Sequence, residues 1–425
     1  MFDNNNVTCI SPWHEIRINT DGSLTYCHFS KDLTSSPDIK FIEWFKSGQQ
    51  VVAARHNIQQ GKEVTGCANC YKEDKLGMVT HRNRRNLQAA IYPGWEKLSL
   101  EQSPTFQRLK KIEVEQKPSF IHVSLGNLCN LSCRMCRPLY SSNLSRTLTK
   151  AGISGEKEIY DWTDNSELWQ DFLYNLVIKN PSLLCLHFMG GEPLYHKKFY
   201  QVLDTCIKHK KTDFHLTFVS NGTIYSGELI DKLKYFKSVQ IEISVENFHK
   251  SNDYTRIGSN FNEIKQNIIK FNSNQHSNIS VILRTVYQAL TAGDYTSILN
   301  FAIDQNLNID NNVLHDPKFL SAVILPKRYK ENLYHNISNY EKYIQDKYNV
   351  KEDNFLNSLR NRSEVVKDCM RIVHDIKKLL NVAEPDNIEE LRRQFVSYNK
   401  KIDAVTENNF LNVYPELEEF YVQYS

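Results

Sequence analysis

The chain has little of several features that define common classes of protein. Its 425 residues include only 15 glycines, which argues against glycine-rich phosphate loops as the main chemistry. No stretch reaches the roughly 18 consecutive apolar residues of a membrane-spanning helix. The 52 Lys and Arg nearly balance the 49 Asp and Glu, and no basic aromatic stripe is present, so neither a membrane nor a nucleic-acid partner is expected.

Two further observations bound the answer. The first ten residues, MFDNNNVTCI, lack the charged-then-apolar layout of a secretory signal, so a cytoplasmic location is expected. The length predicts two or three domains at about 150 residues each, and a hydrophobic content of 40% is ordinary for globular proteins. Composition alone leaves ten cysteines to be explained.

The cysteines fall into two groups and three single positions. Seven of the ten lie before residue 140, and grouped cysteines in a reducing compartment are more often metal ligands than disulfide partners. Cys185, Cys206 and Cys369 stand alone in apolar or amphipathic stretches, where a free cysteine is a small core residue.

The second group forms a C-x3-C-x2-C loop between a predicted strand and a helical stretch. Its members are Cys129, Cys133 and Cys136. Structural zinc sites take four ligands, and no fourth cysteine or histidine lies close by in the sequence. Three thiolates would instead fill three corners of an iron–sulfur cubane and leave one iron open, which is the mark of a catalytic metal site.

Apolar runs and amphipathic stretches alternate after this loop. Strands are predicted at 120–125, 183–188, 214–220, 238–245, 279–286 and 308–314. Helices are predicted at 165–178, 196–211, 226–236, 261–274 and 294–305. This order is typical of parallel βα units buried on both faces, and six of them fit an open barrel with its site at the carboxyl ends of the strands.

The three-cysteine loop resembles the hallmark of the radical S-adenosylmethionine (SAM) superfamily, which follows the first strand of a partial (β/α)6 barrel. The turn after the second predicted strand strengthens the resemblance, because that family uses a GGEP backbone there to bind the amino group of SAM. The turn consists of Gly190, Gly191, Glu192 and Pro193. Glycines permit such a close approach of backbone to ligand, although a plain β-to-α turn is the alternative.

The resemblance implies roles for further residues. Ser220 and Asn221 end the third strand facing the cofactor, Ser244 faces the SAM ribose, and Arg256 pairs with the methionine carboxylate. The residue before the third cysteine is usually aromatic and packed on adenine. Here it is Met135, a departure that puts the strength of adenine stacking in doubt.

The N-terminal group comprises Cys9, Cys27, Cys67 and Cys70. Asp21-Gly22 predicts a hairpin between the first two, and a helical stretch at 41–59 precedes the C-x2-C knuckle formed by the others. Four converging thiolates suit either zinc or one fully ligated iron–sulfur cluster. The spacing resembles the SPASM and twitch extensions of radical SAM enzymes, here placed before the barrel, and that resemblance implies one auxiliary cluster, with [4Fe–4S] the expected type.

We therefore expect an α/β chain of three parts. A cysteine-rich cluster module occupies 1–115, a partial (β/α)6 radical SAM barrel 116–328, and a helical extension 329–425. The extension carries no group of residues that suggests chemistry, and Asp386 or Asn387 is available to cap one of its helices.

The resemblance also implies an activity. A [4Fe–4S] cluster with an open iron binds SAM, one electron cleaves SAM to a 5′-deoxyadenosyl radical, and that radical abstracts hydrogen from a peptide or protein side chain. The auxiliary cluster relays an electron, and a flavodoxin or ferredoxin supplies reducing power. A sugar or nucleotide substrate and a non-enzymatic zinc or iron–sulfur protein are the alternatives. Glu246, Tyr287 and His315 end predicted strands and are the candidate catalytic groups.

Overall fold

The computed structural model describes residues 9–27, 30, 40–75, 80, 82, 86, 117–153, 159–314, 316–348 and 364–425. The candidate residue His315 and the predicted boundary near residue 115 lie outside these ranges. No helix among the described residues is long and apolar enough to cross a membrane.

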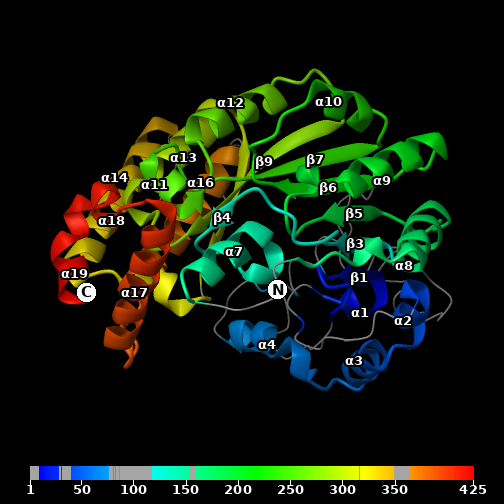
Figure 1. The fold of residues 1–425 in the computed structure, drawn as a ribbon, viewed down its shortest axis with the longest axis horizontal. Helices are drawn as coiled ribbons and strands as arrows, with labels where there is room; N and C mark the ends of the chain where they lie inside the picture. Colours follow the sequence, from blue (N-terminus) through cyan, green and yellow to red (C-terminus); the bar gives the residue numbers. More distant parts are fainter. Residues whose placement is uncertain are drawn as a thin grey trace.

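One eight-stranded sheet organises the chain (Figure 1). Its strands, in spatial order, are β10 (Asn308–Val313), β9 (Ile279–Tyr287), β7 (Ser238–Ser244), β6 (His215–Ser220), β5 (Cys185–Phe188), β3 (Phe120–Val123), β1 (Glu15–Ile18) and β2 (Leu24–Thr25). Neighbouring strands are parallel except for the β1–β2 hairpin. The carboxyl ends of seven strands therefore meet at one edge.

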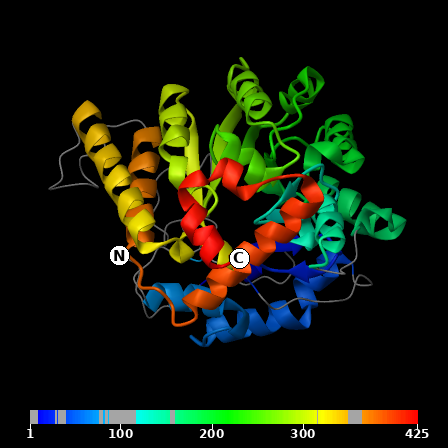
Figure 2. The same cartoon turned by 60° about the vertical axis from the view of Figure 1, so that its left-hand side comes forward.

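Helices follow the strands and cover the outer face of the sheet (Figures 1 and 2). They are α7 (Ser142–Lys150), α8 (Ser166–Gln170), the π-helix η5 (Asp171–Ile178), α9 (Lys197–Lys208), α10 (Gly227–Leu233), α11 (Lys250–Thr255), α12 (Phe261–Asn272) and α13 (Thr296–Asp304). Phe199 of α9 packs edge-to-face on Phe188 of β5 and Phe218 of β6, with ring centroids 5.0 and 5.2 Å apart. Because side chains alternate along a strand, His187 and Thr217 project from the opposite, inner face.

The two ends of the chain add helices at the sides of this layer. The N-terminal ones are α1 (Ser11–His14), α2 (Phe41–Ser47), α3 (Gln49–Gln59) and α4 (Ala68–Lys75). The C-terminal ones are α14 (Lys327–Tyr348), α16 (Glu364–Leu380), α17 (Ile388–Thr406), α18 (Phe410–Val413) and α19 (Glu418–Gln423). Figure 2 shows α14 and α16 side by side, and their buried residues join the main core.

The α/β architecture, all six barrel strands and the helical C-terminal region are confirmed. Two features differ from the sequence predictions. The helix predicted at 41–59 breaks at Gly48, whose extended ψ of 131° ends α2. A Cβ there would lie 2.6 Å from the Trp44 carbonyl oxygen. Asn387 occupies the N-cap position of α17 but makes no side-chain capping bond.

The hairpin of the predicted N-terminal module also lies in the barrel sheet. β1 pairs in parallel with β3, from Glu15 opposite Phe120 to Ile18 opposite Val123. Gly22 takes the positive φ of +83° that the hairpin turn requires. The hairpin between Cys9 and Cys27 thus belongs to the same sheet as the barrel strands, so the sheet extends across the boundary predicted at residue 115.

Candidate active site

The three-cysteine loop follows β3 and is tied down on both sides. Ser132 and Cys133 form the short strand β4, which pairs with β8 (Arg256–Ile257) in a separate two-stranded sheet. The Cys136 amide donates to the Cys133 carbonyl at 3.0 Å, which closes a turn between these two cysteines. The Cys129 amide donates to Ser142 Oγ at 3.4 Å, at the start of α7. Each cysteine therefore has a defined backbone position.

Arg134, inside the loop, is fully buried and anchors the loop to the C-terminal extension. Its guanidinium donates to the Tyr254 carbonyl at 2.9 Å, to Asn399 Oδ1 at 3.0 Å and to Asp403 Oδ1 at 2.5 Å. It also lies 3.9 Å from the Tyr254 ring centroid. Tyr398 Oη donates to the Arg134 carbonyl at 2.7 Å. Helix α17, which the sequence predicted to carry no chemistry, thus holds the loop in place.

Polar donors approach two of the three sulfurs. Arg256 Nη1 lies 3.8 Å from Cys133 Sγ, and Asn221 Nδ2 lies 3.9 Å from Cys129 Sγ. Burial raises the pKa of both Cys129 and Cys133 to about 12, and that of Cys136 to about 11. The thiols are thus protonated without a metal, and a metal would displace the protons because the thiolate is the ligand.

The glycine turn after β5 meets the loop through the backbone. The Gly191 amide donates to the Tyr140 carbonyl at 3.1 Å, and the Glu192 amide donates to the Leu128 carbonyl at 2.8 Å. Gly191 has a φ of +59°, and a Cβ on it would lie 2.6 Å from the Leu128 carbonyl oxygen. Only glycine fits this position, so the turn is a cradle beside the cysteines and more than a generic β-to-α connection.

Glu192 is a buried structural carboxylate in this turn. Oε2 accepts from the Asn221 amide at 2.6 Å and Oε1 from the Leu194 amide at 3.1 Å. Burial raises the pKa of Glu192 to about 7 although these bonds oppose the shift. Glu192 therefore links the ends of β5 and β6, and Asn221 Nδ2 lies near Cys129 of the loop.

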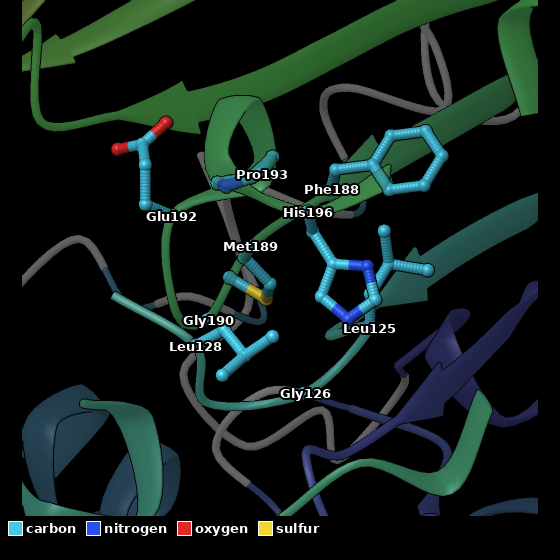
Figure 3. Close-up of a pocket in the computed structure, with 9 residues that line it drawn as sticks. All are labelled: Leu125, Gly126, Leu128, Phe188, Met189, Gly190, Glu192, Pro193 and His196. Atoms are coloured by element: carbon cyan, nitrogen blue, oxygen red, sulfur yellow. The ribbon is translucent and has the colours of Figure 1, made fainter. Parts of the chain in front are cut away.

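A narrow pocket lies behind the turn (Figure 3). Its lining joins the ends of β3 and β5 and includes Leu125, Gly126, Leu128, Phe188, Met189, Gly190, Glu192, Pro193 and His196. Figure 3 shows the His196 ring directed back toward Leu125, whereas the Glu192 carboxyl points away from the other labelled side chains. His196 Nε2 lies 3.2 Å from Asp161 Oδ2, so a hydrogen-bonded pair of side chains occupies this side of the pocket.

The remaining candidates divide into paired and buried groups. Glu246 and Arg256 form an ion pair, with Arg256 Nε donating to Glu246 Oε1 at 3.1 Å, so the guanidinium already has a carboxylate partner. Tyr287 is 1% exposed, and its ring packs on Tyr295. Burial raises the Tyr287 pKa far above its usual range. Ser244 is half-buried at the end of β7.

The sequence did not reveal a polar network on the inner face. His122 Nδ1 lies 3.1 Å from His187 Nδ1, and His122 Nε2 lies 3.5 Å from Glu15 Oε2. Further along, Arg284 Nε donates to Glu242 Oε2 at 2.8 Å. The signal was available as polar residues inside predicted strands. Strand alternation would have placed them on one face, but the strand order needed to join them was unknown.

The N-terminal cysteines are gathered only in part by the described contacts. Cys9, Cys27 and Cys70 are buried and Cys67 is half-buried. Burial raises the pKa of Cys9 to about 12, and a smaller contribution comes from Cys67. The Tyr26 hydroxyl lies 3.8 Å from Cys67 Sγ. Cysteine thiolates in this region would suit either zinc or an iron–sulfur cluster.

The cofactor fits the three-cysteine loop by the chemistry of its donors. Among the described residues, no three His, Cys, Asp or Glu side chains are grouped closely enough to hold a single metal ion. A cubane instead takes each thiolate on a different iron. One buried and two half-buried cysteines, with polar donors near two of their sulfurs and a glycine cradle beside them, suit such a cluster.

The fold and this arrangement define a class of protein. It is a parallel α/β barrel in which a loop of three cysteines, suited to a metal cluster, follows strand β3. Residues 123–302 match the family model described as the Radical SAM superfamily. Over these residues, which form most of the barrel, the chain is similar to the radical SAM superfamily.

A curated relative and several solved structures are similar to the chain. The radical SAM cyclopropyl synthase TigE of Paramaledivibacter caminithermalis is 25% identical over 237 residues, which cover 52% of this chain and 46% of the relative. Native anSMEcpe with bound AdoMet is 16% identical, with a TM-score of 0.40, and the match covers 57% of this chain and 62% of that one. Streptococcus suis SuiB bound to S-adenosylmethionine is 14% identical, with a TM-score of 0.34 and coverages of 77% and 67%. The chain spans about half the length of the curated relative.

Proposed function

We propose that this enzyme reductively cleaves SAM and abstracts hydrogen from a peptide or protein side chain, with an auxiliary cluster at the N-terminal cysteines as electron relay. One observation carries the SAM assignment. Backbone hydrogen bonds from Gly191 to Tyr140 and from Glu192 to Leu128 hold the glycine cradle against both ends of the three-cysteine loop. Cleavage of SAM needs SAM and the cluster to be held next to each other, and two adjacent, rigid backbone segments would do this.

The residues supply binding, orientation and exclusion of water. When bound, the cluster and SAM provide one-electron cleavage of the sulfur–C5′ bond, which gives methionine and a 5′-deoxyadenosyl radical that removes a hydrogen atom from the substrate. Cys129, Cys133 and Cys136 would ligate the cluster through three irons. Asn221 and Arg256 donate toward two of the sulfurs and so stabilise negative charge there. Gly190 and Gly191 have no side chain to cover their backbone, which is the property that would let the amino acid part of SAM approach it.

Two observations support a peptide substrate and an electron relay at the N-terminal cysteines. The N-terminal cysteine spacing resembles modules that accompany peptide-modifying members of the superfamily. The curated relative is named a cyclopropyl synthase, a name that supports radical chemistry at carbon. Oxidation of a substrate radical releases one electron, and a cluster at Cys9, Cys27, Cys67 and Cys70 would accept it.

The decisive assay measures 5′-deoxyadenosine after anaerobic reconstitution with iron and sulfide, reduction and addition of SAM. We expect product from the wild type and none from Cys133→Ala. Cys369→Ala is the matched control, because Cys369 is also buried and its thiol donates to the Leu299 carbonyl, away from the loop. Absence of product from a wild-type sample that holds its full iron would refute the proposed activity.

Metal analysis tests the relay separately. Two cubanes correspond to about eight irons per chain, and Cys67→Ala should retain about four of them. Zinc bound by the wild type and lost in Cys67→Ala would replace the auxiliary cluster with a structural zinc site.

A further inference from the structure

The buried arginines of the described chain follow a rule with one exception. Those exposed by less than 10% are Arg17, Arg82, Arg134, Arg256 and Arg392. Four of them form ion pairs, with Asp74, Asp403, Glu246 and Glu384 respectively. Arg17, only 4% exposed, has no carboxylate partner among the described residues.

The contacts of Arg17 are neutral and incomplete. Nε donates to Asn19 Oδ1 at 2.8 Å, and Nη2 lies 3.5 Å from the Tyr140 hydroxyl. Nη1 is buried and has no hydrogen-bond partner among the described residues. The acid two positions earlier on the same face, Glu15, is engaged with Ser11 and His122 instead. The guanidinium therefore has an unused donor in a buried position.

Such an arrangement is costly unless something completes it. A buried cation without a partner loses its hydration, and burial lowers the pKa of Arg17 accordingly. The other four buried arginines of the described chain offset that loss through ion pairs with carboxylates. An uncompensated charge in a well-packed protein is a reason to look for an anion that binds there.

The surroundings place this donor between the two cysteine groups. The Tyr140 backbone carbonyl, on one side, accepts the hydrogen bond from the Gly191 amide of the cradle. Across the hairpin Arg17 lies opposite Thr25, whose hydroxyl donates to the Cys27 carbonyl at 3.1 Å.

Two hydroxyls at the same edge of the sheet are in the same condition as Nη1. Thr20 Oγ1 and Ser124 Oγ are buried without a hydrogen-bond partner. Both side chains adjoin Gly190, because a Cβ on Gly190 would lie 2.6 Å from Ser124 Oγ and 3.2 Å from Thr20 Cγ2. These two hydroxyls therefore lie where the ends of β1 and β3 meet the cradle, and Arg17 belongs to β1.

We propose that Arg17, oriented by Asn19 and Tyr140, anchors a binding site for a carboxylate of the substrate between the SAM cradle and the N-terminal cysteines. The assignment rests on the proposed function for the identity of the substrate as a peptide. A carboxylate is the group that a planar guanidinium fork binds best, through two parallel hydrogen bonds. An aspartate, a glutamate or the chain terminus of a peptide supplies one.

The test compares unfolding midpoints of the anaerobically reconstituted chain. Arg17→Met removes the unpaired charge, and its midpoint should lie at or above that of the wild type. Arg392→Met is the matched control, because it removes a buried arginine that is paired with Glu384 and Glu389, and its midpoint should fall. A fall of equal size in both variants would make Arg17 a structural residue and overturn the proposal.

A ligand arm uses two small probes that differ in charge, N-acetyl-aspartate methylamide and N-acetyl-asparagine methylamide. At about 50 mM the aspartate probe should raise the wild-type midpoint by about 2 °C. It should not shift Arg17→Met, and the asparagine probe should shift neither protein. Equal responses to both probes, or a response retained in Arg17→Met, would overturn a carboxylate site at Arg17.

Two further measurements separate other anions. A dissociation constant for SAM weakened more than threefold in Arg17→Met would assign the carboxylate to SAM itself. Loss of about half the iron in that variant would assign the anion to the N-terminal cluster. Either result overturns the substrate assignment. Deoxyadenosine formed by the same wild-type sample reports on the proposed function independently, so a failure of the activity and a failure of the carboxylate site remain distinct.

Discussion

Two regions at the same edge of the sheet treat buried charge in opposite ways. At the three-cysteine loop, Arg134 within the loop is paired with Asp403, and Arg256 on the adjoining strand β8 is paired with Glu246. At the start of the sheet, Arg17 is buried without a carboxylate partner among the described residues. The buried arginines of the first region are paired with carboxylates, whereas Arg17 of the second region has a hydrogen-bond donor without a partner among the described residues.

The difference corresponds to different tasks. A loop that positions a cluster must hold its geometry before the cofactor arrives, and ion pairs with satisfied hydrogen bonds provide that rigidity. A site for an exchangeable substrate must keep donors available, which costs stability when the site is empty. The predictions below test how far each description holds.

The largest effect is expected at Asp403, the partner of Arg134. Asp403→Ala leaves a fully buried guanidinium without its carboxylate and removes an acceptor from the Phe410 amide. Breaking a buried pair on one side costs about 3–5 kcal/mol, so urea denaturation should show a loss of that order. Iron bound at the three-cysteine loop should decline as well.

Glu390→Ala is the matched control for Asp403, since Glu390 is an exposed acid on the same helix. Its free energy of unfolding should change by less than about 0.5 kcal/mol. An Asp403 variant as stable as the control would mean that α17 does not hold the loop.

The second effect concerns the cradle, which shares the tight packing of the loop. Gly191→Ala forces a side chain into positive φ and against two carbonyl oxygens, those of Leu128 and Gly126. Overpacking adds about 1–3 kcal/mol to the roughly 1 kcal/mol cost of the left-handed conformation. Gly152→Ala isolates the second cost, because Gly152 has a φ of +65° and open space around it. Equal unfolding free energies for the two variants would show that the cradle has room to spare.

Much of the barrel could be predicted from local patterns. Most of the six predicted barrel strands are largely apolar runs, although Asn308–Val313 is mainly polar, and the cysteine and glycine motifs are contiguous in the sequence. Burial on both faces produces such runs whatever the neighbours are.

The contacts that distinguish the two regions had no local signal. Arg134 and Asp403 are 269 positions apart. Arg134 stands at an unspecified position of the cysteine motif, and Asp403 belongs to no motif. The place of β1 beside β3 depends on parallel pairing across a segment of about one hundred residues, which no periodicity records. Arg17 looked like one polar residue in a hairpin. The lack of a carboxylate beside Arg17 among the described residues depends on the folded surroundings alone.

The third effect is a pH dependence from Glu192, a buried acid in the otherwise charge-paired loop region. Its pKa is raised from 4.5 to about 7, so folding favours the protonated form. This contribution to stability is fully present below pH 4.5 and is lost as the pH rises through 7. From pH 5.5 to 8 the wild type should lose about 2 kcal/mol relative to Glu192→Gln in urea denaturation.

Glu242→Gln is the control for that comparison. His187 and Arg284 lower the pKa of Glu242 to about 2 despite its burial, so its charge does not change between pH 5.5 and 8. The difference between wild type and Glu242→Gln should therefore stay constant over this range. A constant difference for Glu192→Gln as well would place the Glu192 pKa near its ordinary value.

The smallest effect is expected at Met135, the least anchored residue of the loop. Its neighbour Arg134 is fixed on all sides, whereas Met135 is half-buried and packs only at the margin of the core. If it covers the adenine of SAM, Met135→Phe supplies a flat ring and should tighten SAM binding about threefold without changing iron content, because aromatic stacking adds about 0.5–1.5 kcal/mol. Equilibrium dialysis of the reconstituted protein measures this directly, with Met189→Phe as a control. Met189 lies beyond the loop, in the pocket behind the cradle, and the larger ring should be neutral or harmful there. Unchanged SAM affinity in Met135→Phe would mean that adenine lies elsewhere, and that the rigidity conferred by Arg134 serves the cluster alone.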